Sequence, residues 1–267
     1  MSSYLMAGQL SELERLQLQS RVWEPAGERL LVKLKRENGR RAVDIGCGAM
    51  SWLRILSRWV GTEGEVLGTD IDATLLEAAR GFVDAEKLGN VEVRRDDLFA
   101  SQLEPNSFDL VHARFQLAPL GRAEEQITLY RRLVRPGGWL VLEEPDTSSW
   151  HFNPPAPAAQ RLIALILEAF RAAGGNFDMG RELPALLGKH GLAPQIRAEV
   201  EALPPGHPYL RLPLQFARSL EQRLTKLLSG AELRELREQA EGELSTNDRW
   251  GLTFTLVQAF TEVGEMQ

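Results

Sequence analysis

The residues best suited to bind a ligand lie in the segment VDIGCG, residues 43–48, which contains Asp44, Gly46, Cys47 and Gly48. Glycines directly after an apolar run permit a tight turn and let the backbone approach a ligand closely. A turn that only packs a helix against a strand would need the same glycines, and a cysteine inside it is more typical of a small buried side chain than of a nucleophile. The loop alone therefore indicates a ligand without identifying it.

A second carboxylate, Asp70, ends the apolar run EVLGTD and follows Gly48 by 22 residues. In dinucleotide-type folds a carboxylate at this distance accepts hydrogen bonds from both ribose hydroxyls. The alternative is a helix cap, a role that Asp72 could fill equally well. The pair of segments predicts a nucleoside site.

Charge separates the two cofactor classes that fit this geometry. A pyrophosphate loop of the form G-x-G-x-x-G needs a third glycine where this chain has Ser51. Further carboxylates near other strand ends would repel a pyrophosphate and suit the ammonium and sulfonium of S-adenosylmethionine. They are Asp44, Asp96, Asp97, Glu143 and Glu144. The charges favour S-adenosylmethionine, and an NAD(P)-dependent oxidoreductase is the alternative.

The elements that must position these residues begin at Arg41, where short apolar runs start to alternate with amphipathic segments. This alternation predicts a parallel sheet covered by helices on both faces. The expected strands are RAVDI, EVLGTD, VEVRR, FDLVH and WLVLEE, and the expected helices lie near 51–60, 73–88, 123–133 and 155–173. Ligands of such sheets bind beyond the carboxyl ends of the strands, which is where the residues above fall.

The flanking segments are less regular. Residues 11–35 have helical spacing, which Pro25 is expected to split into two helices. Beyond Gly174 we expect further elements, namely a helix near 181–189, a strand at 195–202, helices at 214–228 and 231–244, the second capped by Ser229, and a strand at 252–263.

The expected architecture is an α/β, Rossmann-like, doubly wound and mostly parallel seven-stranded sheet. Residues 1–38 are expected to form N-terminal lid helices, and residues 204–249 a helical substrate cap inserted before the last strand. Residues 39–203 and 250–267 would then form the cofactor-binding core.

Composition excludes several classes of protein. The 267 residues are 43% hydrophobic and 25% charged, values typical of a globular protein and not of a fibrous or disordered one. A net charge of −6 argues against nucleic acid as a partner, and no run of about 18 apolar residues predicts a membrane span. The single cysteine and the N-terminal sequence favour a cytoplasmic protein, and no metal-ligand spacing is present.

Five segments, in this order, resemble the class I S-adenosylmethionine-dependent methyltransferases, in particular the UbiE-like branch often called methyltransferase type 11. They are VDIGCG at 43–48, GTDID at 68–72, RRDDLF at 94–99, FDLVHARF at 108–115 and LVRPGGWLVLEE at 133–144. The resemblance covers about residues 41–146 and is weaker in the N-terminal helices and the last strand. It implies transfer of a methyl group from S-adenosylmethionine to a small, aromatic or lipophilic acceptor by in-line SN2 displacement.

The resemblance also implies cofactor contacts, residue by residue. The loop would cradle the methionine part, Asp70 would hold the ribose hydroxyls, and Ile71 would form an apolar shelf under the adenine. Asp97 would accept from the adenine amino group, and Leu98 would donate a backbone amide to the ring. Beside the amino-acid tail and the methyl group would lie His112, Ala113 and Arg114, and two lid residues would reach the cofactor, Tyr4 and Gln19.

Methyl transfer from a sulfonium requires alignment and exclusion of water, and it needs a base only when the acceptor is a protonated hydroxyl or amine. His112 and His151 are the candidate bases, with a hydrogen-bonded scaffold role as the alternative. Many relatives of this family have a histidine at the position where this chain has Pro119, so a base is not available there. A further alternative is a methyltransferase-like protein that binds the cofactor without methyl transfer.

Aromatic side chains are expected to stack on the acceptor, or else to pack the cap onto the sheet. They are Phe115, Trp150, Phe152 and Tyr209. The expected partner is a small-molecule methyl acceptor, whereas the sequence leaves open whether the protein is a monomer or a dimer and whether the methyl group goes to oxygen, nitrogen or carbon.

Overall fold

The large sheet of this computed structural model has seven strands in the order β3-β2-β1-β4-β5-β10-β7. The structure describes residues 10–34 and 40–264. The strands are β1 (Arg41–Ile45), β2 (Glu65–Asp70), β3 (Val91–Arg95), β4 (Phe108–Arg114), β5 (Val134–Asp146), β7 (Gln195–Glu199) and β10 (Thr255–Val263). β10 pairs antiparallel with β5 and β7, whereas the other pairs are parallel. The expected mostly parallel seven-stranded sheet is confirmed.

Strand β1 lies where the strand order reverses, between β2 and β4. The register places Asp44 opposite both Gly68 and His112, so the ends of the three strands meet at one edge. β4 is buried along its whole length because helices cover both faces of the sheet. Such a switch point is where open α/β sheets bind ligands.

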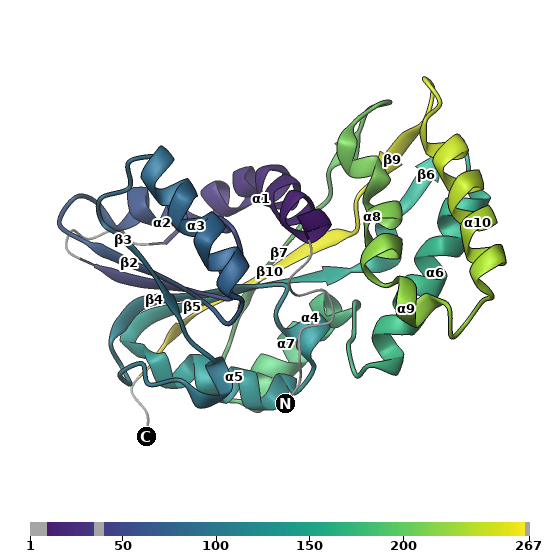
Figure 1. The fold of residues 1–267 in the computed structure, drawn as a ribbon. Coiled ribbons are helices and arrows are strands. Elements are labelled where there is room, and N and C mark those ends of the chain that lie inside the picture. Colours follow the sequence, from purple (N-terminus) through teal and green to yellow (C-terminus); the bar gives the residue numbers. More distant parts are fainter. Residues whose placement is uncertain (1–9, 35–39, 265–267) are drawn as a thin grey trace.

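Helices cover the two faces of this sheet in separate groups (Figure 1). On one side lie α1 (Leu10–Leu31), α2 (Leu53–Val60) and α3 (Ala73–Ala85), and on the other α4 (Leu117–Leu120), α5 (Ala123–Leu133) and α7 (Met179–Lys189). Each group buries an apolar core against the strands, with Trp52 and Leu56 on the first side and Tyr130 and Leu183 on the second. Among the residues that the structure describes, no helix is long and apolar enough to cross a membrane.

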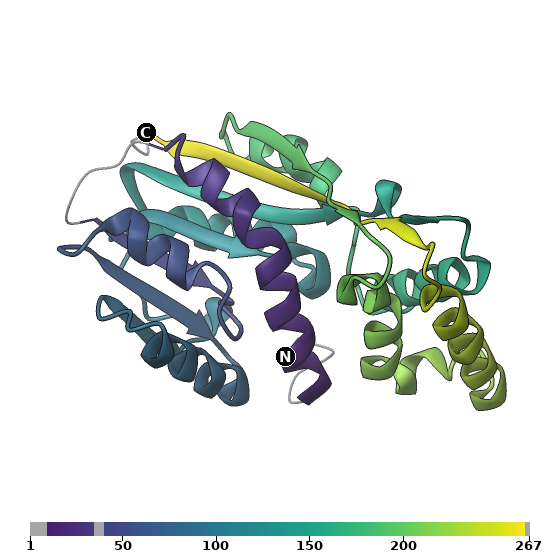
Figure 2. The ribbon, with the colours of Figure 1, turned by 90° about the horizontal axis from the view of Figure 1, so that it is seen from above.

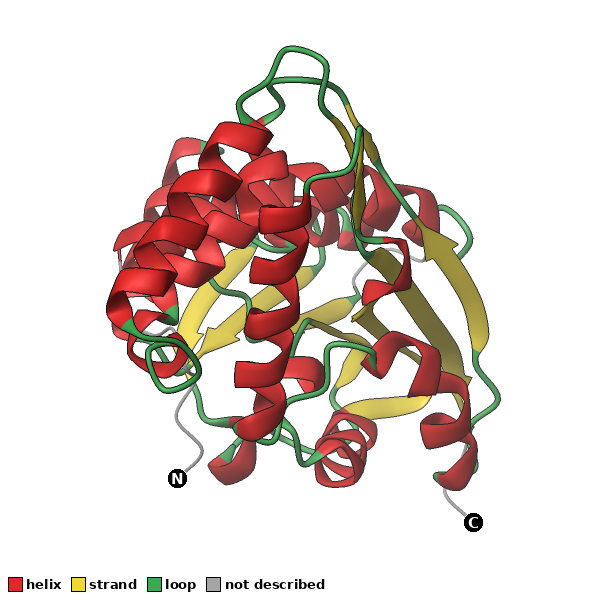
Figure 3. Cartoon of the chain, turned by 90° about the vertical axis from the view of Figure 1, so that its right-hand side faces the viewer, coloured by secondary structure: helices red, strands yellow, loops and turns green. Residues whose placement is uncertain are grey.

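A second group of elements, here called the cap lobe, stands beyond the ends of β5 and β10 (Figures 1 and 3). It contains the small sheet β6-β9-β8 and four helices. They are β6 (His151–Asn153), β8 (Ala202–Leu203), β9 (Trp250–Leu252), α6 (Pro157–Ala172), α8 (Leu212–Ser219), α9 (Glu221–Leu224) and α10 (Gly230–Leu244). Short 3-10 turns complete the chain at η1 (Leu98–Ala100), η2 (Thr147–Ser149) and η3 (Pro208–Arg211).

Helix α1 joins the two parts of the molecule, and it lies across the sheet and reaches the cap lobe (Figure 2). Its residues Trp23 and Ala26 belong to the apolar core of the cap lobe, whereas Leu30 and Leu31 belong to the core between α2 and the sheet. The division of the chain into lid, core and cap stays a prediction.

Four expected elements differ in continuity from the structure. The expected strand at 195–202 ends at Glu199, and Ala202 belongs to β8 in the small sheet. Pro25 does not split the N-terminal helix, because it lies on the exposed face of α1, where water can reach the carbonyl group that proline leaves without a donor. The expected helix at 214–228 is interrupted at the buried Leu220. The expected final strand at 252–263 is two strands, because Thr253 leaves the ladder and exchanges hydrogen bonds with Glu201.

Candidate active site

The glycine loop after β1 has the backbone geometry that its sequence predicts. Gly46 and Gly48 have φ values of +67° and +54°, in the left-handed region that disfavours side chains. The Cys47 N–H donates to the Thr69 carbonyl at 2.8 Å, and the Gly48 N–H donates to Asp70 Oδ2 at 2.9 Å. The loop is therefore fixed to the end of β2.

Asp70 and Asp72 have different roles. Asp70 Oδ1 accepts from the Asp72 N–H at 2.9 Å, so the carboxylate binds the loop through one oxygen and the start of α3 through the other. Burial raises the pKa of Asp70, opposed by the N–H groups of Asp72 and Gly48. Asp72 is the N-cap of α3 and accepts from Thr74 and Leu75. The capping role therefore falls to Asp72, and Asp70 is left facing the cavity.

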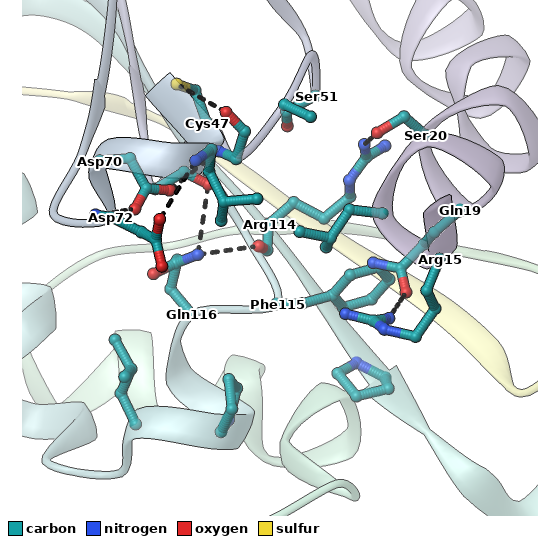
Figure 4. Close-up of a pocket in the computed structure, with 18 of the residues that line it drawn as sticks. Arg15, Gln19, Ser20, Cys47, Ser51, Asp70, Asp72, Arg114, Phe115 and Gln116 are labelled. Carbon is teal, nitrogen blue, oxygen red and sulfur yellow. Dashed lines mark hydrogen bonds between the residues drawn. The ribbon is translucent and has the colours of Figure 1, made fainter. Parts of the chain in front are cut away.

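A cavity opens beside this loop and is lined by eight of the residues singled out in the sequence (Figure 4). These are Gln19, Gly46, Cys47, Gly48, Asp70, Ile71, Arg114 and Phe115. Ile71 is 49% exposed and lines the cavity, so it presents an apolar surface next to Asp70. Burial, with Asp44 and Asp70 nearby, raises the pKa of the Cys47 thiol well above its usual range, so this cysteine is not an activated nucleophile.

Two walls of the cavity differ in chemistry. The aromatic wall consists of Phe115, Phe177, Phe216 and Phe254. The basic wall consists of Arg15, Gln19, Ser20 and Arg114, which lie on the α1 side, across from Asp70 and Asp72 (Figure 4). Ser20 Oγ accepts from Arg114 Nη2 at 3.3 Å, so α1 holds the arginine at the end of β4.

Behind the cavity, a buried network joins the ends of β1, β4 and β5. His112 Nδ1 lies 2.7 Å from Asp44 Oδ1, and His112 Nε2 lies 3.2 Å from Glu143 Oε2. Burial disfavours the imidazolium, but the two carboxylates together raise the pKa of His112. Trp52 stacks on the imidazole with ring centres 3.8 Å apart, and the backbone N–H of Trp52 donates to Asp44 Oδ2. His112 has no exposed surface, and the cavity lining does not include it.

Glu144 fixes the turn that follows β4. Its carboxylate accepts from three successive N–H groups, those of Gln116, Leu117 and Ala118, at 2.9, 2.7 and 3.0 Å. Burial raises the pKa of Glu144 to about 8, against the effect of these donors. Gln116 and Pro119 line the cavity, so this carboxylate shapes its floor from behind.

The acidic rim expected from the sequence is narrower in the structure. Three of these carboxylates have no exposed surface and lie behind the cavity, namely Asp44, Glu143 and Glu144. Their oxygens form hydrogen bonds with a histidine, a glutamine or backbone N–H groups. The carboxylates that line the cavity are Asp70 and Asp72, and two arginines line it as well. The cavity is therefore lined by both acidic and basic side chains. Charge alone favours S-adenosylmethionine over a pyrophosphate cofactor less strongly than the sequence indicated.

The other predicted residues lie away from the cavity lining. Asp97 is exposed and caps η1 by accepting from Phe99, with Leu98 beside it, and Ala113 is buried in β4. His151 is exposed in β6. Trp150, Phe152 and Tyr209 pack in the core of the cap lobe, which was the alternative role given to them. Tyr4 lies outside the described residues. The roles of all these residues stay predictions.

Sequence reasoning missed the residues that come from distant elements. Arg15, Phe177, Phe216 and Phe254 line the cavity from α1, the segment before α7, α8 and the gap between β9 and β10. No motif marks them. Gln116, next to a predicted residue, could have been found because it follows β4 directly.

Comparisons with known proteins match part of this chain to a methyltransferase family. Residues 42–138 match the family model described as a methyltransferase domain. The demethylmenaquinone methyltransferase of Geobacillus kaustophilus is 32% identical over 117 residues, which are 44% of this chain and 50% of that protein. The chain spans about half the length of the curated relatives it matches.

Two solved structures share the fold over most of the chain. The YcgJ protein of Bacillus subtilis superimposes with a TM-score of 0.58 at 16% identity, covering 88% of this chain and 97% of that one. Phosphoethanolamine N-methyltransferase 2 of Haemonchus contortus, solved with S-adenosylmethionine, has a TM-score of 0.52 at 18% identity, covering 90% of this chain and 53% of that one. At these identities the likeness establishes the fold.

Proposed function

We propose that this chain is a class I S-adenosylmethionine-dependent methyltransferase of the UbiE-like type, and that it transfers a methyl group from S-adenosylmethionine to a small acceptor. One observation carries the proposal: the glycine loop, Asp70 and the exposed Ile71 meet at one end of a single cavity. A nucleoside needs a hydroxyl acceptor, an apolar shelf and a close backbone, and these residues supply all three.

The residues present fit the amino-acid part of the cofactor as well. Arg114 is 6% exposed and lines the cavity, and its Nη1 finds no hydrogen-bond acceptor within the described residues. A buried donor without an acceptor costs about 1–3 kcal/mol, so a ligand oxygen at this point would be favoured. We assign Arg114 to the methionine carboxylate and the Gly46–Gly48 loop to the chain between carboxylate and sulfur.

When bound, S-adenosylmethionine supplies a methyl group on a sulfonium, which is already a good leaving group. The protein then has to orient the acceptor and keep water away. The aromatic wall can do both, because its four phenylalanines line the same cavity as Arg114 and come from the residue after β4, the segment before α7, α8, and the connection between β9 and β10. These residues would hold the acceptor and shield it from water, and the bound cofactor would supply the methyl group.

A histidine base does not fit the geometry. Among the described residues, no imidazole lines the cavity, and both nitrogens of His112 already face carboxylates. We therefore propose that His112 positions the Asp44 carboxylate. That carboxylate in turn accepts from the backbone N–H of Trp52 and fixes the end of the glycine loop. The acceptor would be nucleophilic without a histidine base, or would lose its proton to water.

The lining of the cavity indicates the class of acceptor. The aromatic wall favours an apolar or aromatic molecule, and the relatives from Geobacillus and Staphylococcus are named for a quinone-type substrate. Since the chain spans about half of those relatives, we propose the class of acceptor, small and at least partly aromatic, and not its identity.

Calorimetry with S-adenosylhomocysteine and with NAD tests the cofactor. We expect binding of the first and none of the second. Asp70→Asn should weaken S-adenosylhomocysteine binding about 100-fold, because it removes a charged acceptor from the ribose hydroxyls. Glu77→Gln, a substitution of an exposed carboxylate on α3, is the matched control and should leave binding within about two-fold.

Product analysis then tests methyl transfer. Incubation with labelled S-adenosylmethionine and a panel of phenols and quinols should give labelled small-molecule product. Tight NAD binding without heat from S-adenosylhomocysteine would contradict the proposal in favour of an oxidoreductase. Cofactor binding without product on any panel member would favour a protein that binds the cofactor and does not transfer its methyl group.

A further inference from the structure

Arg15 occupies a position that the cofactor assignment leaves unused. It lies on α1, is 3% exposed, and lines the same cavity as Arg114. Its Nη1 donates to Gln19 Oε1 at 2.6 Å, and Gln19, one helical turn later, also lines the cavity. A guanidinium at this depth keeps its charge, and its five donors can serve more than one acceptor.

The surroundings of Arg15 belong to the acceptor side of the cavity. Its guanidinium lies over the ring of Phe216, 4.7 Å from the ring centre, and Phe216 is part of α8 in the cap lobe. Arg114, in contrast, lies at the end of β4 with Glu143 Oε2 3.8 Å from its Nη1. Both arginines are buried, but they contact different elements, since Arg114 lies near Glu143 of β5 and Arg15 lies over Phe216 of α8.

The electrostatic effect of Arg15 is felt by a second group at the same boundary. Tyr209 is buried and accepts from Trp23 Nε1 at 3.2 Å, which joins α1 to the cap lobe. Burial raises the pKa of Tyr209 to about 12, and Trp23, Arg15 and Arg114 act in the opposite direction. Arg15 and Arg114 thus both lie within electrostatic range of Tyr209, in an apolar setting where screening by water is weak.

We propose that the methyl acceptor carries an anionic group on an apolar body, and that Arg15 with Gln19 receives this group while the aromatic wall holds the rest. The inference rests on the proposed function, and it narrows the acceptor from small and aromatic to small, aromatic and acidic. A buried guanidinium beside aromatic rings favours a carboxylate over a neutral group of the same shape, because the donors are charged and partly desolvated.

The test uses two probes that differ only in charge, 4-hydroxycinnamate and 4-hydroxycinnamamide, added to the full chain saturated with S-adenosylhomocysteine. We expect the acid to bind at least about ten times more tightly than the amide. Arg15→Met should remove this preference and leave amide and S-adenosylhomocysteine affinities within about two-fold. Arg21→Met, which changes an exposed arginine of the same helix, is the matched control.

Several results would overturn the inference. Equal affinity of acid and amide, or binding of neither, removes the anion subsite. Loss of S-adenosylhomocysteine affinity in Arg15→Met, with the acid preference intact, assigns this arginine to the cofactor instead. Arg15→Lys retains the charge and should keep most of the preference, which guards against misfolding of the methionine variant. Failure of the wild-type chain to bind S-adenosylhomocysteine would count against the proposed function, whereas the other results count against the anion subsite alone.

Discussion

The glycine-loop end and the cap end of the cavity are formed by different kinds of groups: mainly backbone groups close in sequence at the first, and side chains from distant segments at the second. At the loop end, backbone groups and one carboxylate from residues 44–72 meet within two consecutive strand–helix turns, and the Gly48 N–H to Asp70 bond at 2.9 Å joins them. At the cap end, the side chains come from Arg15, Phe177, Phe216 and Phe254, which are separated by up to most of the chain. The first end is specified locally, whereas the second exists only after the cap lobe has packed on α1.

This difference has a functional meaning. A nucleoside is the same molecule in every enzyme that uses it, and backbone groups held by strand ends recognise it with little dependence on side chains. An acceptor differs from one enzyme to the next, and side chains on helices of a separate lobe can change without disturbing the sheet. Substitutions at the two ends should therefore have separable effects on cofactor and acceptor.

The largest effect is expected at Gly46. Gly46 and Gly48 both have positive φ, so alanine introduces similar backbone strain of about 1 kcal/mol at either position. A Cβ on Gly46 would also overlap the amide group of Gln116, whereas one on Gly48 would meet Leu16 Cδ1 at an ordinary 3.6 Å. We expect Gly46→Ala to lower the free energy of unfolding by about 2–3 kcal/mol and Gly48→Ala by about 1 kcal/mol.

Urea unfolding and calorimetry with S-adenosylhomocysteine measure this pair of variants. The Gln116 side chain must move in Gly46→Ala, which breaks its bonds to the carbonyls of Gly46 and Arg114, both 3.4 Å long. Cofactor affinity should consequently fall about tenfold further than in Gly48→Ala. Equal losses would mean that strain alone governs the loop and that Gln116 has no part in its geometry.

Glu144 provides a smaller effect that depends on pH. Its pKa is raised from an ordinary 4.5 to about 8 by burial, so the folded chain holds a proton that the unfolded chain releases over that range. Folding is therefore favoured at low pH, and this contribution is lost as the pH rises through 8. Between pH 6 and 8 the free energy of unfolding should fall by about 2 kcal/mol from this group.

Unfolding of Glu144→Gln at a series of pH values checks this expectation. Glutamine does not titrate, so the variant should lose the part of the dependence of unfolding free energy on pH that comes from Glu144. Its NH2 group cannot accept a hydrogen bond from a backbone N–H, so the variant should also be less stable than the wild type at pH 6. Asp70 and His112 also have raised pKa values, and they lower the free energy of unfolding with rising pH in the wild type and in Glu144→Gln alike. The difference between the pH slopes of the two proteins therefore reports Glu144. Parallel pH profiles would show that the carboxylate is ionised throughout.

The sequence was sufficient for the parts of the fold that depend on local pattern. The largely apolar run FDLVH indicates the buried strand β4, and the two glycines after β1 indicate the turn at which Gly46 and Gly48 have positive φ. The alternation of apolar runs with amphipathic segments indicates the strands of the large sheet, and a serine directly before a helical segment indicates the cap at Ser229.

The rest depended on contacts that no local pattern records. Whether Asp44 and Glu143 face a ligand or a buried partner is decided by His112, which pairing of β1 with β4 brings between them. Likewise, Arg15 lines the cavity because Trp23 and Ala26 pack in the cap lobe and fix the rotation of α1. Charge at strand ends can be counted in a sequence, but its compensation by neighbours cannot.

The smallest effect is expected at Ser229, and it tests whether the two ends of the cavity are independent. Ser229 Oγ accepts from the Glu232 N–H at 3.3 Å, and Glu232 Oε2 accepts from the Ser229 N–H at 2.9 Å, which together cap α10 in the cap lobe. Ser229→Ala removes one half of this capping box and should lower the free energy of unfolding by about 1 kcal/mol.

Because α10 packs on α6 and is absent from the cavity lining, S-adenosylhomocysteine affinity should stay within about two-fold in Ser229→Ala. Hydrogen exchange followed by mass spectrometry would place the loss of protection in residues 230–244, with β1 and β2 unchanged. Loss of protection in the glycine loop as well would show that the cap lobe and the sheet unfold as one unit. The cofactor end and the acceptor end would then be separate in space but would share one unfolding transition.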